Sequence, residues 1–309
     1  MRTLLFLLLA CSLLAACQAT DTTPESAQLS LRQTEEKIDI FYGDAPVLTY
    51  WIAPQLADSL PEHYRRSGFI HPIYSPAGRI VTDDFPVGHA HQHGLFMAWT
   101  KADFQDEFVD FWNQQKELGT VEHVAVLDVQ NQADTASFTT RLQHRSLQHG
   151  IVLEEIWELK ISAKDSLYYL DLASTQTNLT QDTLFLPEYH YGGFGLRGSK
   201  HWNQDDSLHF QAEAHFITSA GLSRDSANHS RPLWTAIYGP LEGDTAGMLI
   251  IDDPDNFRHP QPVRVHPEMP YLSMAPSVAG DFHIAPGETY RTKYRVMVFD
   301  GELPAIPPQ

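Results

Sequence analysis

Three histidines, His89, His91 and His93, occupy alternate positions in one short segment of the chain. If this segment is extended, their side chains share one face, with about 6.6–7 Å between positions two residues apart. Two imidazoles at this spacing could bind one metal ion or one polar ligand, whereas a helical backbone would separate them. The spacing therefore marks this segment as the first candidate for metal ligation or proton transfer.

A second chemical pair lies about a hundred positions later, where Glu188 and His190 precede two glycines. A carboxylate and an imidazole two residues apart again share a face of an extended chain, and glycine permits a close approach of backbone or ligand. We expect this pair and the first segment to meet across a concave site, within about 4–6 Å.

Three interpretations of these residues remain open. A divalent metal ion could be held by His89, His91 and His190. Alternatively, a histidine and Glu188 could exchange protons with a bound polar substrate without any metal. In the third interpretation the histidines only make structural hydrogen bonds. The expected catalytic residues are His89, His91, Glu188 and His190.

Other side chains could orient a substrate. His71 precedes a proline and should be extended, which suits a ligand contact. Arg79 and Arg197 could each hold a carboxylate through two hydrogen bonds, although an internal ion pair is the commoner role of an arginine. Trp112 offers a flat apolar face for a sugar ring, with core packing as its alternative role. The expected substrate-binding residues are His71, Arg79, Trp112, Arg197 and Asn256.

A period of two dominates the chain that must position these residues. In residues 151–161, apolar side chains at 151, 153, 157, 159 and 161 share one face, while Glu154, Glu158 and Lys160 share the other, as in a half-buried strand. The same alternation occurs in residues 120–129, 136–146, 167–177, 246–252 and 290–299. The pattern predicts an antiparallel meander in an all-β fold, a large β-sandwich, with a short helical turn within residues 103–117.

Composition and missing motifs exclude several functions. The 309 residues carry a formal charge of −18, which repels nucleic-acid backbones, so we expect no nucleic-acid partner. The sequence has no glycine-rich dinucleotide or phosphate loop, no Gly-x-Ser-x-Gly elbow and no His-Glu-x-x-His motif. Nucleotide-dependent, serine-hydrolase and zincin activities therefore lose support.

The first residues predict export. Arg2 precedes two apolar stretches, the second of which ends in small residues and Cys17, an arrangement that resembles the lipobox of bacterial lipoproteins. We expect a signal peptide over residues 1–16, a lipid on Cys17, a flexible tether over residues 17–36 and a single domain over residues 37–309. The protein would then lie in the bacterial cell envelope, on the outer membrane or a periplasmic face, and would contact the membrane only through its lipid.

Several segments resemble the PmoA-like family of bacterial proteins: residues 71–79 (HPIYSPAGR), 89–95 (HAHQHGL), 191–197 (YGGFGLR) and 256–260 (NFRHP). Many members have a His-Pro-His-His-Arg-Gly run, whereas this chain has Gln92 and His93 in place of the second adjacent histidine and the arginine, which favours His89 and His91 over His93. The resemblance implies a β-sandwich of the galactose-mutarotase type and carbohydrate chemistry.

Together these observations predict an exported lipoprotein that acts on a carbohydrate as a hydrolase, lyase or isomerase, with a divalent metal ion as the one cofactor that the histidines suggest. A non-catalytic carbohydrate-binding lipoprotein is the alternative from another class. A metal-dependent oxygenase is a further alternative and requires a bound redox metal.

Overall fold

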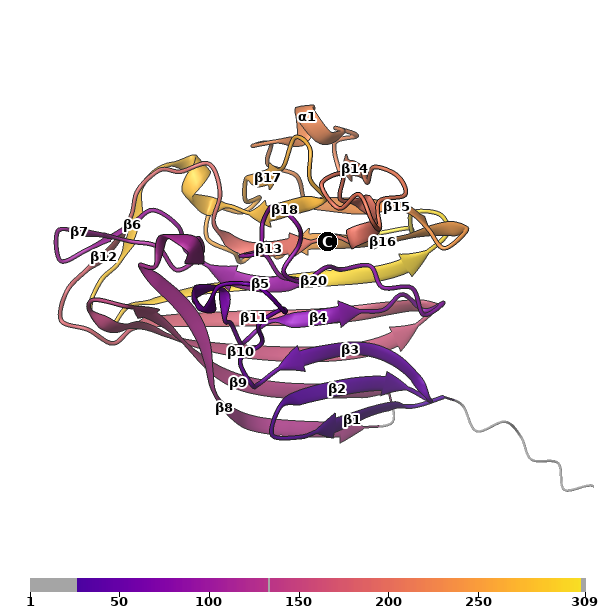
Figure 1. Ribbon diagram of the computed structural model, residues 1–309, viewed down its shortest axis with the longest axis horizontal. Helices are drawn as coiled ribbons and strands as arrows, with labels where there is room; N and C mark the ends of the chain where they lie inside the picture. Colours follow the sequence, from indigo (N-terminus) through magenta and orange to yellow (C-terminus); the bar gives the residue numbers. More distant parts are fainter. Residues whose placement is uncertain (1–26, 133, 307–309) are drawn as a thin grey trace, which may run out of the picture.

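A computed structural model describes residues 27–132 and 134–306. Two large antiparallel sheets lie face to face, and a small third sheet lies at one end of the molecule (Figure 1). The all-β antiparallel sandwich predicted from the alternating pattern is confirmed. No helix in the described ranges is long and apolar enough to cross a membrane.

The sheet nearer the viewer in Figure 1 is called the front sheet. In spatial order its strands are β1 (Leu29–Gln33), β2 (Lys37–Tyr42), β3 (Ala45–Trp51), β4 (Ile70–Ile73), β5 (Leu95–Ala98), β13 (Gly193–Arg197), β18 (Tyr271–Met274) and β17 (Val263–Val265). Strands β5, β13 and β18, which come from distant parts of the chain, are neighbours at its centre.

The opposite sheet is called the back sheet. Its strands, in spatial order, are β14 (His215–Thr218), β15 (Trp234–Leu241), β16 (Asp244–Asp252), β20 (Thr289–Asp300), β11 (Leu167–Asn178), β10 (Gly150–Lys164), β9 (Thr135–Ser146) and β8 (Gly119–Gln132). Strands β8 to β11 form the expected meander, but β20 from the end of the chain then joins β11 to β16.

The remaining elements are short. The small sheet has the order β19 (Phe282–Ile284), β12 (Leu184–Leu186), β6 (Ala102–Phe104) and β7 (Glu107–Val109). The helical turns are η1 (Glu62–Tyr64), η2 (Gln114–Lys116), η3 (Lys200–Trp202), α1 (Arg224–Ala227) and η4 (Pro276–Ala279).

Strand β10 shows how the alternating sequence becomes a sandwich. Leu153, Trp157 and Ile161 are buried between the sheets, as their spacing predicts. Ile151 is 42% exposed instead, because the register between β9 and β10 shifts between positions 151 and 153 and turns its side chain outward. Glu155 is fully buried on the inner face, between Leu153 and Trp157.

The buried carboxylate of Glu155 is stabilised by four hydrogen bonds. His144 Nε2 lies 2.8 Å from Glu155 Oε2, and Trp157 Nε1, Ser174 Oγ and Gln176 Nε2 donate to Oε1 over 2.7, 2.5 and 3.1 Å. Burial alone would raise the pKa of Glu155, but these bonds, led by the one with His144, hold the pKa below its usual value. An ionised carboxylate is therefore part of the core.

The network also joins the two sheets. Gln176 of β11 accepts a hydrogen bond from Trp99 Nε1 over 2.6 Å and donates to Met97 Sδ of β5 over 2.9 Å. Met97 belongs to the front sheet and Gln176 to the back sheet. Polar side chains therefore help to fix how the sheets lie on each other.

One predicted boundary needs correction. Residues 29–33, assigned to the tether, form strand β1, whose residues pair with Ile38–Tyr42 of β2. The short helical turn expected within residues 103–117 is present as η2, and β6 and β7 occupy the first part of that segment. The predicted signal peptide and Cys17 lie outside the described residues.

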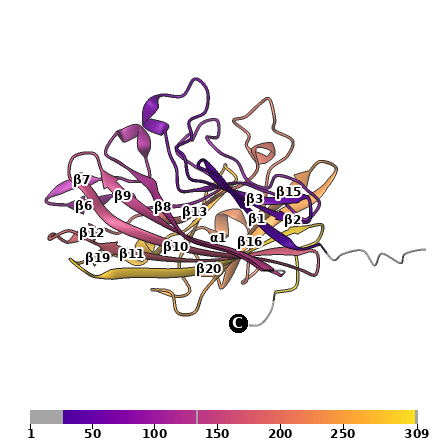
Figure 2. The ribbon, with the colours of Figure 1, turned by 90° about the horizontal axis from the view of Figure 1, so that it is seen from below.

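The outer face of the front sheet carries the loops that matter for function. Seen from below in Figure 2, the two sheets lie as layers, and the long loops stand beyond the front sheet, away from the back sheet. In β13, Phe194 points inward and stacks on Tyr294 of β20, with ring centroids 4.7 Å apart. Because side chains alternate along a strand, Gly195 and Arg197 lie on the outer face.

Candidate functional site

The loop that carries the paired histidines is anchored at both ends beside Arg197. Asp83 N donates to the carbonyl oxygen of Arg197 over 3.3 Å, and Arg197 N donates to the carbonyl oxygen of Gly94 over 2.8 Å. Residues 84–93 therefore form a loop that leaves and rejoins the front sheet at the position of Arg197. The local sequence brings His89 and His91 to this arginine.

Fully buried aromatic rings lie beneath the site. Trp112 lies over β13, next to Phe96 of β5, with ring centroids 4.5 Å apart, so it packs in the core and exposes no face to solvent. The indole can approach this closely because position 195 is glycine, where a side chain would collide with both rings. Phe96 in turn contacts the ring of His93, with centroids 5.6 Å apart.

Three imidazoles gather above these rings. The ring of His89 lies 5.5 Å from that of His91 and 5.7 Å from that of His266, a residue from the loop between β17 and β18. Burial lowers the pKa of His91 to about 3 and that of His266 to about 4, and it also lowers the pKa of His89. All three rings are therefore neutral at pH 7, a state in which each has one nitrogen that can accept a proton.

Arg197 is the fixed charge at the centre of the site. It is fully buried, and its Nη1 donates to Gln92 Oε1 over 3.0 Å. Burial is the main cause of the low pKa of His89, and the positive charge of Arg197 is the next. The same charge also lowers the pKa of His266, again after burial. Arg197 thus helps to keep these imidazoles neutral.

Asp83 supplies a carboxyl group with an unusual affinity for protons. It is 8% exposed, and burial raises its pKa to about 6 against the opposing effect of the Arg197 charge. A carboxyl group with this pKa exists in both forms near neutral pH, as a general acid or base requires. Arg197 thus has a titratable carboxyl group and neutral imidazoles as electrostatic neighbours.

His93 has a different role from the other two histidines of its segment. It is fully buried, stacks on Phe69 with centroids 4.4 Å apart, and its Nδ1 makes a short hydrogen bond with Asp84 Oδ1. Burial raises the pKa of Asp84 and lowers that of His93, so the pair shares one proton and carries no net charge. This pair holds the loop in place.

Several buried polar atoms on this side of the front sheet have no hydrogen-bond partner among the described residues. They are His89 Nδ1, Trp112 Nε1, Arg197 Nε and Arg197 Nη2. A buried polar group left unsatisfied costs about 1–3 kcal/mol, so such groups are rare in folded proteins. Their concentration on one face marks it as a site for a polar ligand.

A run of rings connects the histidine cluster with the second predicted segment. Successive centroid distances are 5.5 Å for His91–His89, 5.7 Å for His89–His266, 6.4 Å for His266–Tyr271, 5.9 Å for Tyr271–Trp112, 5.7 Å for Trp112–Tyr191 and 4.8 Å for Tyr191–His190. His190 thus lies at the other end of this run from His91. Glu188 and His190 line a separate pocket of about 360 Å³ with Tyr189, His229 and Val278.

This arrangement corrects the expected metal site. Within residues 27–132 and 134–306, no three His, Cys, Asp or Glu side chains come together closely enough to hold a metal ion. His89 and His91 are neighbours, but the third expected ligand, His190, is separated from them by other rings. The ligand set His89, His91 and His190 therefore does not form among the described residues.

The other predicted residues lie in different surroundings. His71 Nδ1 lies 3.0 Å from Thr82 Oγ1, and burial lowers its pKa to about 4. Arg79 is held by Asp300 over 2.7 Å and by Asp244 over 3.4 Å, so its charge is used within the protein.

Asn256 is also fully engaged by the protein. Its Nδ2 donates to Asp252 Oδ1 over 2.7 Å and to the carbonyl oxygen of Lys293 over 2.8 Å, while its Oδ1 accepts from Lys293 N over 2.7 Å. These bonds give the side chain a structural role at the back sheet.

The sequence did not point to His266, Asp83 or Gln92. His266 stands alone in a segment with no repeated spacing, and only the pairing of β13 with β18 brings its loop to residues 89–91. Asp83 lies six residues before His89, and Gln92 lies between His91 and His93. Nothing in the sequence indicates that either side chain is buried close to Arg197.

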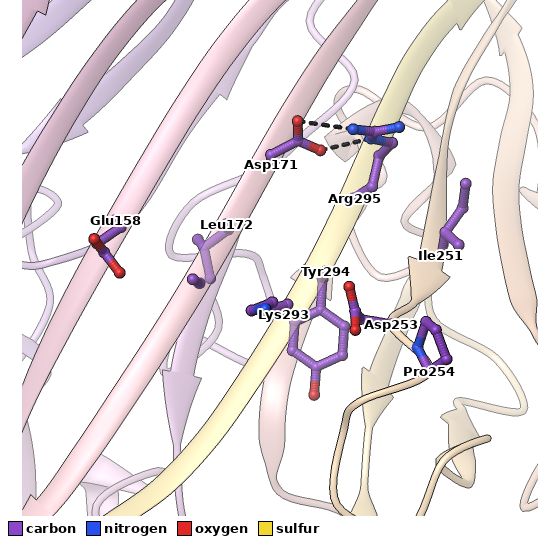
Figure 3. A pocket seen from close by; sticks show the side chains of 10 residues that line it. Glu158, Asp171, Leu172, Ile251, Asp253, Pro254, Lys293, Tyr294 and Arg295 are labelled. Carbon is purple, nitrogen blue, oxygen red and sulfur yellow. Dashed lines mark hydrogen bonds and ion pairs between the residues drawn. The ribbon is translucent and has the colours of Figure 1, made fainter. Parts of the chain in front are cut away.

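A further pocket of about 430 Å³ lies on the outer face of the back sheet (Figure 3). It is lined by charged residues of β10, β11 and β20, and its most prominent contact is the pair of hydrogen bonds between Asp171 and Arg295. None of the predicted site residues lines it.

A family model described as "Family of unknown function (DUF6807)" matches residues 37–306. The chain belongs to the DUF6807 family. The match covers nearly the whole β-sandwich, including every residue of the site described above. It does not show membership of the PmoA-like family that the motifs resemble. No curated protein matches this DUF6807 sequence.

Solved structures similar to this DUF6807 protein include carbohydrate-active enzymes. The α-galactosidase AgaA of Geobacillus stearothermophilus has 9% sequence identity and a TM-score of 0.41, with 89% of this chain and 41% of that chain covered. A galactose mutarotase-like protein of Lactobacillus casei has 7% identity and a TM-score of 0.38, with 87% and 99% covered.

A putative aldose 1-epimerase of Escherichia coli K12 has 10% identity and a TM-score of 0.36, with 87% of this chain and 98% of that chain covered. The DUF6807 chain thus spans about two fifths of the α-galactosidase and nearly all of the two mutarotase-like proteins. The β-sandwich of this chain follows from its own sheet topology.

Proposed function

We propose that this protein binds a carbohydrate on the outer face of its front sheet and catalyses hydrolysis, elimination or isomerisation by proton transfer. The observation that carries the proposal is the grouping of neutral imidazoles, a buried arginine and unsatisfied polar atoms on one face. Carbohydrates offer hydroxyl groups that satisfy such atoms and apolar ring faces that pack on aromatic side chains. The similar structures share the fold alone, so the proposal rests on this site.

In the proposed reaction, neutral His91 or His89 accepts a proton from the substrate in an elimination or isomerisation, or from the attacking water in a hydrolysis. Asp83 in its protonated form donates a proton to the substrate, and Arg197 holds the polar group next to the reacting atoms. The low pKa values keep the imidazoles in the base form at neutral pH and at the same time make His91 a weak base, so His89, whose pKa is lowered less, is the better proton acceptor. The pKa of Asp83 lies close enough to neutrality for it to act as the acid.

Glu188 and His190, expected from the sequence to be catalytic, are proposed instead to contact a more distant part of the ligand. The run of rings through Tyr271, Trp112 and Tyr191 leads from the imidazole cluster to His190. A ligand of more than one sugar unit would reach both. The same run favours the second candidate function, a non-catalytic carbohydrate-binding protein.

We also propose, from the sequence, that the protein is exported and anchored through a lipid on Cys17. A substrate in the cell envelope would then be extracellular or periplasmic carbohydrate.

The test is a panel of monosaccharides, oligosaccharides and polysaccharides offered to the wild-type protein and to His91→Ala. Polarimetry reports epimerisation, new reducing ends report hydrolysis, and ultraviolet absorbance of an unsaturated product reports elimination. We expect His91→Ala to lower kcat by about 10²–10⁴-fold with little change in affinity. The exposed His283 of β19 provides a matched control, His283→Ala, which should keep full activity.

Binding without turnover in the wild-type protein, and unchanged binding in His91→Ala, would establish the non-catalytic alternative. Absence of binding to every carbohydrate of the panel would contradict both.

A further inference from the structure

Arg197 has one edge of its guanidinium group free. Its Nη1 donates to Gln92 Oε1 over 3.0 Å and lies 3.4 Å from Met269 Sδ. Its Nε and Nη2 are buried and have no hydrogen-bond partner among the described residues. These two nitrogens donate in parallel along the same edge of the planar group, so they match a ligand with two adjacent acceptor oxygens.

Two other arginines of this protein hold a carboxylate through the same Nε–Nη2 edge of their guanidinium groups. Arg295 donates through Nε to Asp171 Oδ1 over 2.5 Å and through Nη2 to Asp171 Oδ2 over 3.0 Å (Figure 3). Arg65 uses Nε and Nη2 in the same way for the two oxygens of Glu62. Each of these pairs lies at the surface, whereas the edge of Arg197 is buried and vacant of protein acceptors.

The other buried arginine does not offer this edge. Arg66 lacks partners for Nε and Nη1, but its Nη2 donates to the carbonyl oxygen of Met97 over 3.1 Å. That bond already engages one nitrogen of the Nε–Nη2 edge of Arg66. Of the two fully buried arginines among the described residues, Arg197 is thus the one whose Nε and Nη2 both lack a partner.

The charge of Arg197 is not cancelled by a direct ion pair. Among the described residues no carboxylate forms an ion pair with Arg197, and Asp83 and Asp205 act on its charge only from farther away. The positive charges of Arg264 and Arg224 act on His266, as that of Arg197 does.

We propose that the carbohydrate bound at this site is an acidic sugar, and that Nε and Nη2 of Arg197 hold its carboxylate. The inference rests on the proposed carbohydrate function and names its substrate class. A carboxylate satisfies both free donors and neutralises the buried charge, whereas a hydroxyl group satisfies a donor without neutralising the charge.

The experiment measures binding of D-glucuronate, D-galacturonate and D-mannuronate to the wild-type protein by titration calorimetry. Each acid is compared with its methyl ester, which keeps the ring and removes the charge, and with the parent hexose. D-Glucose 6-phosphate is included to distinguish a phosphate from a carboxylate. We expect at least one acid to bind about tenfold or more tightly than its ester, a difference within the range of a lost charge-assisted hydrogen-bond pair.

The matched variants are Arg197→Lys, which keeps the charge but removes the parallel donors, and Arg295→Lys as a surface control. Arg197→Lys should reduce the preference for acid over ester to less than about threefold, and Arg295→Lys should leave it unchanged. If Arg197→Lys does not fold, the comparison of acid with ester on the wild-type protein still decides the question.

Equal affinity of the wild-type protein for acids, esters and hexoses would overturn the acidic-sugar inference and leave the carbohydrate function standing. Tighter binding of glucose 6-phosphate than of every uronate would overturn it in favour of a phosphate. A preference for the acids that survives in Arg197→Lys would remove Arg197 from the explanation. If no sugar, ester or acid binds, both the inference and the proposed function fail.

Discussion

Gly195 of β13 lies directly under the indole of Trp112, so that a Cβ atom at position 195 would be 2.7 Å from Trp112 Cη2. The same atom would lie 2.9 Å from Phe96 Cε1. The absence of a side chain at this position on the outer face lets the tryptophan pack on the sheet. Gly195 therefore sets how closely the buried Trp112 packs on β13.

Gly195→Ala should displace Trp112 and weaken carbohydrate binding. Overpacking at a buried contact costs about 1–3 kcal/mol of folding free energy, which urea unfolding can measure. Gly221→Ala is the control, since nothing lies within 4 Å of its added Cβ, although its φ of +74° makes alanine strained. Gly221→Ala should lose some stability but keep its binding. Unchanged binding in Gly195→Ala would contradict the placement of the site.

The low pKa of His91 predicts a stability that depends on pH. Burial lowers this pKa from 6.5 to about 3, so the histidine is neutral in the folded state and becomes charged more readily in the unfolded state. Its contribution to stability is complete above pH 6.5 and is lost as the pH falls toward 3. Between pH 6 and pH 4 the free energy of unfolding should fall by about 1.4 kcal/mol per pH unit from this group.

Replacing His91 by asparagine should remove that part of the slope. The measurement is urea unfolding at pH 7, 6, 5 and 4 for the wild-type protein, His91→Asn and the exposed control His283→Asn. A slope in His91→Asn equal to that of the wild-type protein would show that His91 is not buried in its neutral form.

Glu155→Gln should destabilise the protein strongly. The glutamine cannot accept from all the donors that converge on the carboxylate, and breaking a buried charged network costs about 3–5 kcal/mol. Glu158→Gln is a matched control from the same strand, because Glu158 is exposed on the outer face, and it should change stability by less than about 0.5 kcal/mol. Equal effects of the two substitutions would exclude an ionised Glu155 in the core.

The predicted lipid anchor can be tested independently of the fold. In a bacterial host supplied with radioactive palmitate, the wild-type chain should be labelled and should fractionate with membranes. Cys17→Ser should lose both properties, while Cys11→Ser, a change inside the predicted signal peptide, should keep them. Labelling of Cys17→Ser would place the lipid elsewhere or remove it from the explanation.

The sequence predicts six strands of the back sheet well because a half-buried sheet imposes a period of two on its residues. Each of the six alternating segments lies in one of its strands, β8, β9, β10, β11, β16 or β20, whereas the alternating pattern identified no strand of the front sheet. The prediction from alternation fails at Ile151, because a register shift turns this side chain outward. It also fails at Glu155, because a charged residue is normally expected to be exposed, whereas Glu155 is buried. Neither feature has a signal in the spacing of apolar residues.

The candidate site could be predicted only in part. The spacing of His89 and His91 identified two neighbours on one loop, since a local pattern determines local geometry. The residue that lies next to His89 from elsewhere in the chain is His266, and not Glu188 or His190 as the sequence predicts. The position of His266 depends on the pairing of β13 with β18 in the front sheet. Long-range pairing of this kind leaves no mark in the residues around either histidine.

The two backbone hydrogen bonds that join Asp83 and Gly94 to Arg197 have a consequence for how this scaffold can change. They fix the two ends of the loop through main-chain atoms, while Asp84, Gln92 and His93 hold those ends through their side chains. The residues between, 85–91, carry neither kind of anchor to Arg197. New specificities could therefore arise on this sandwich by changes in the middle of the loop while Arg197 stays where it is.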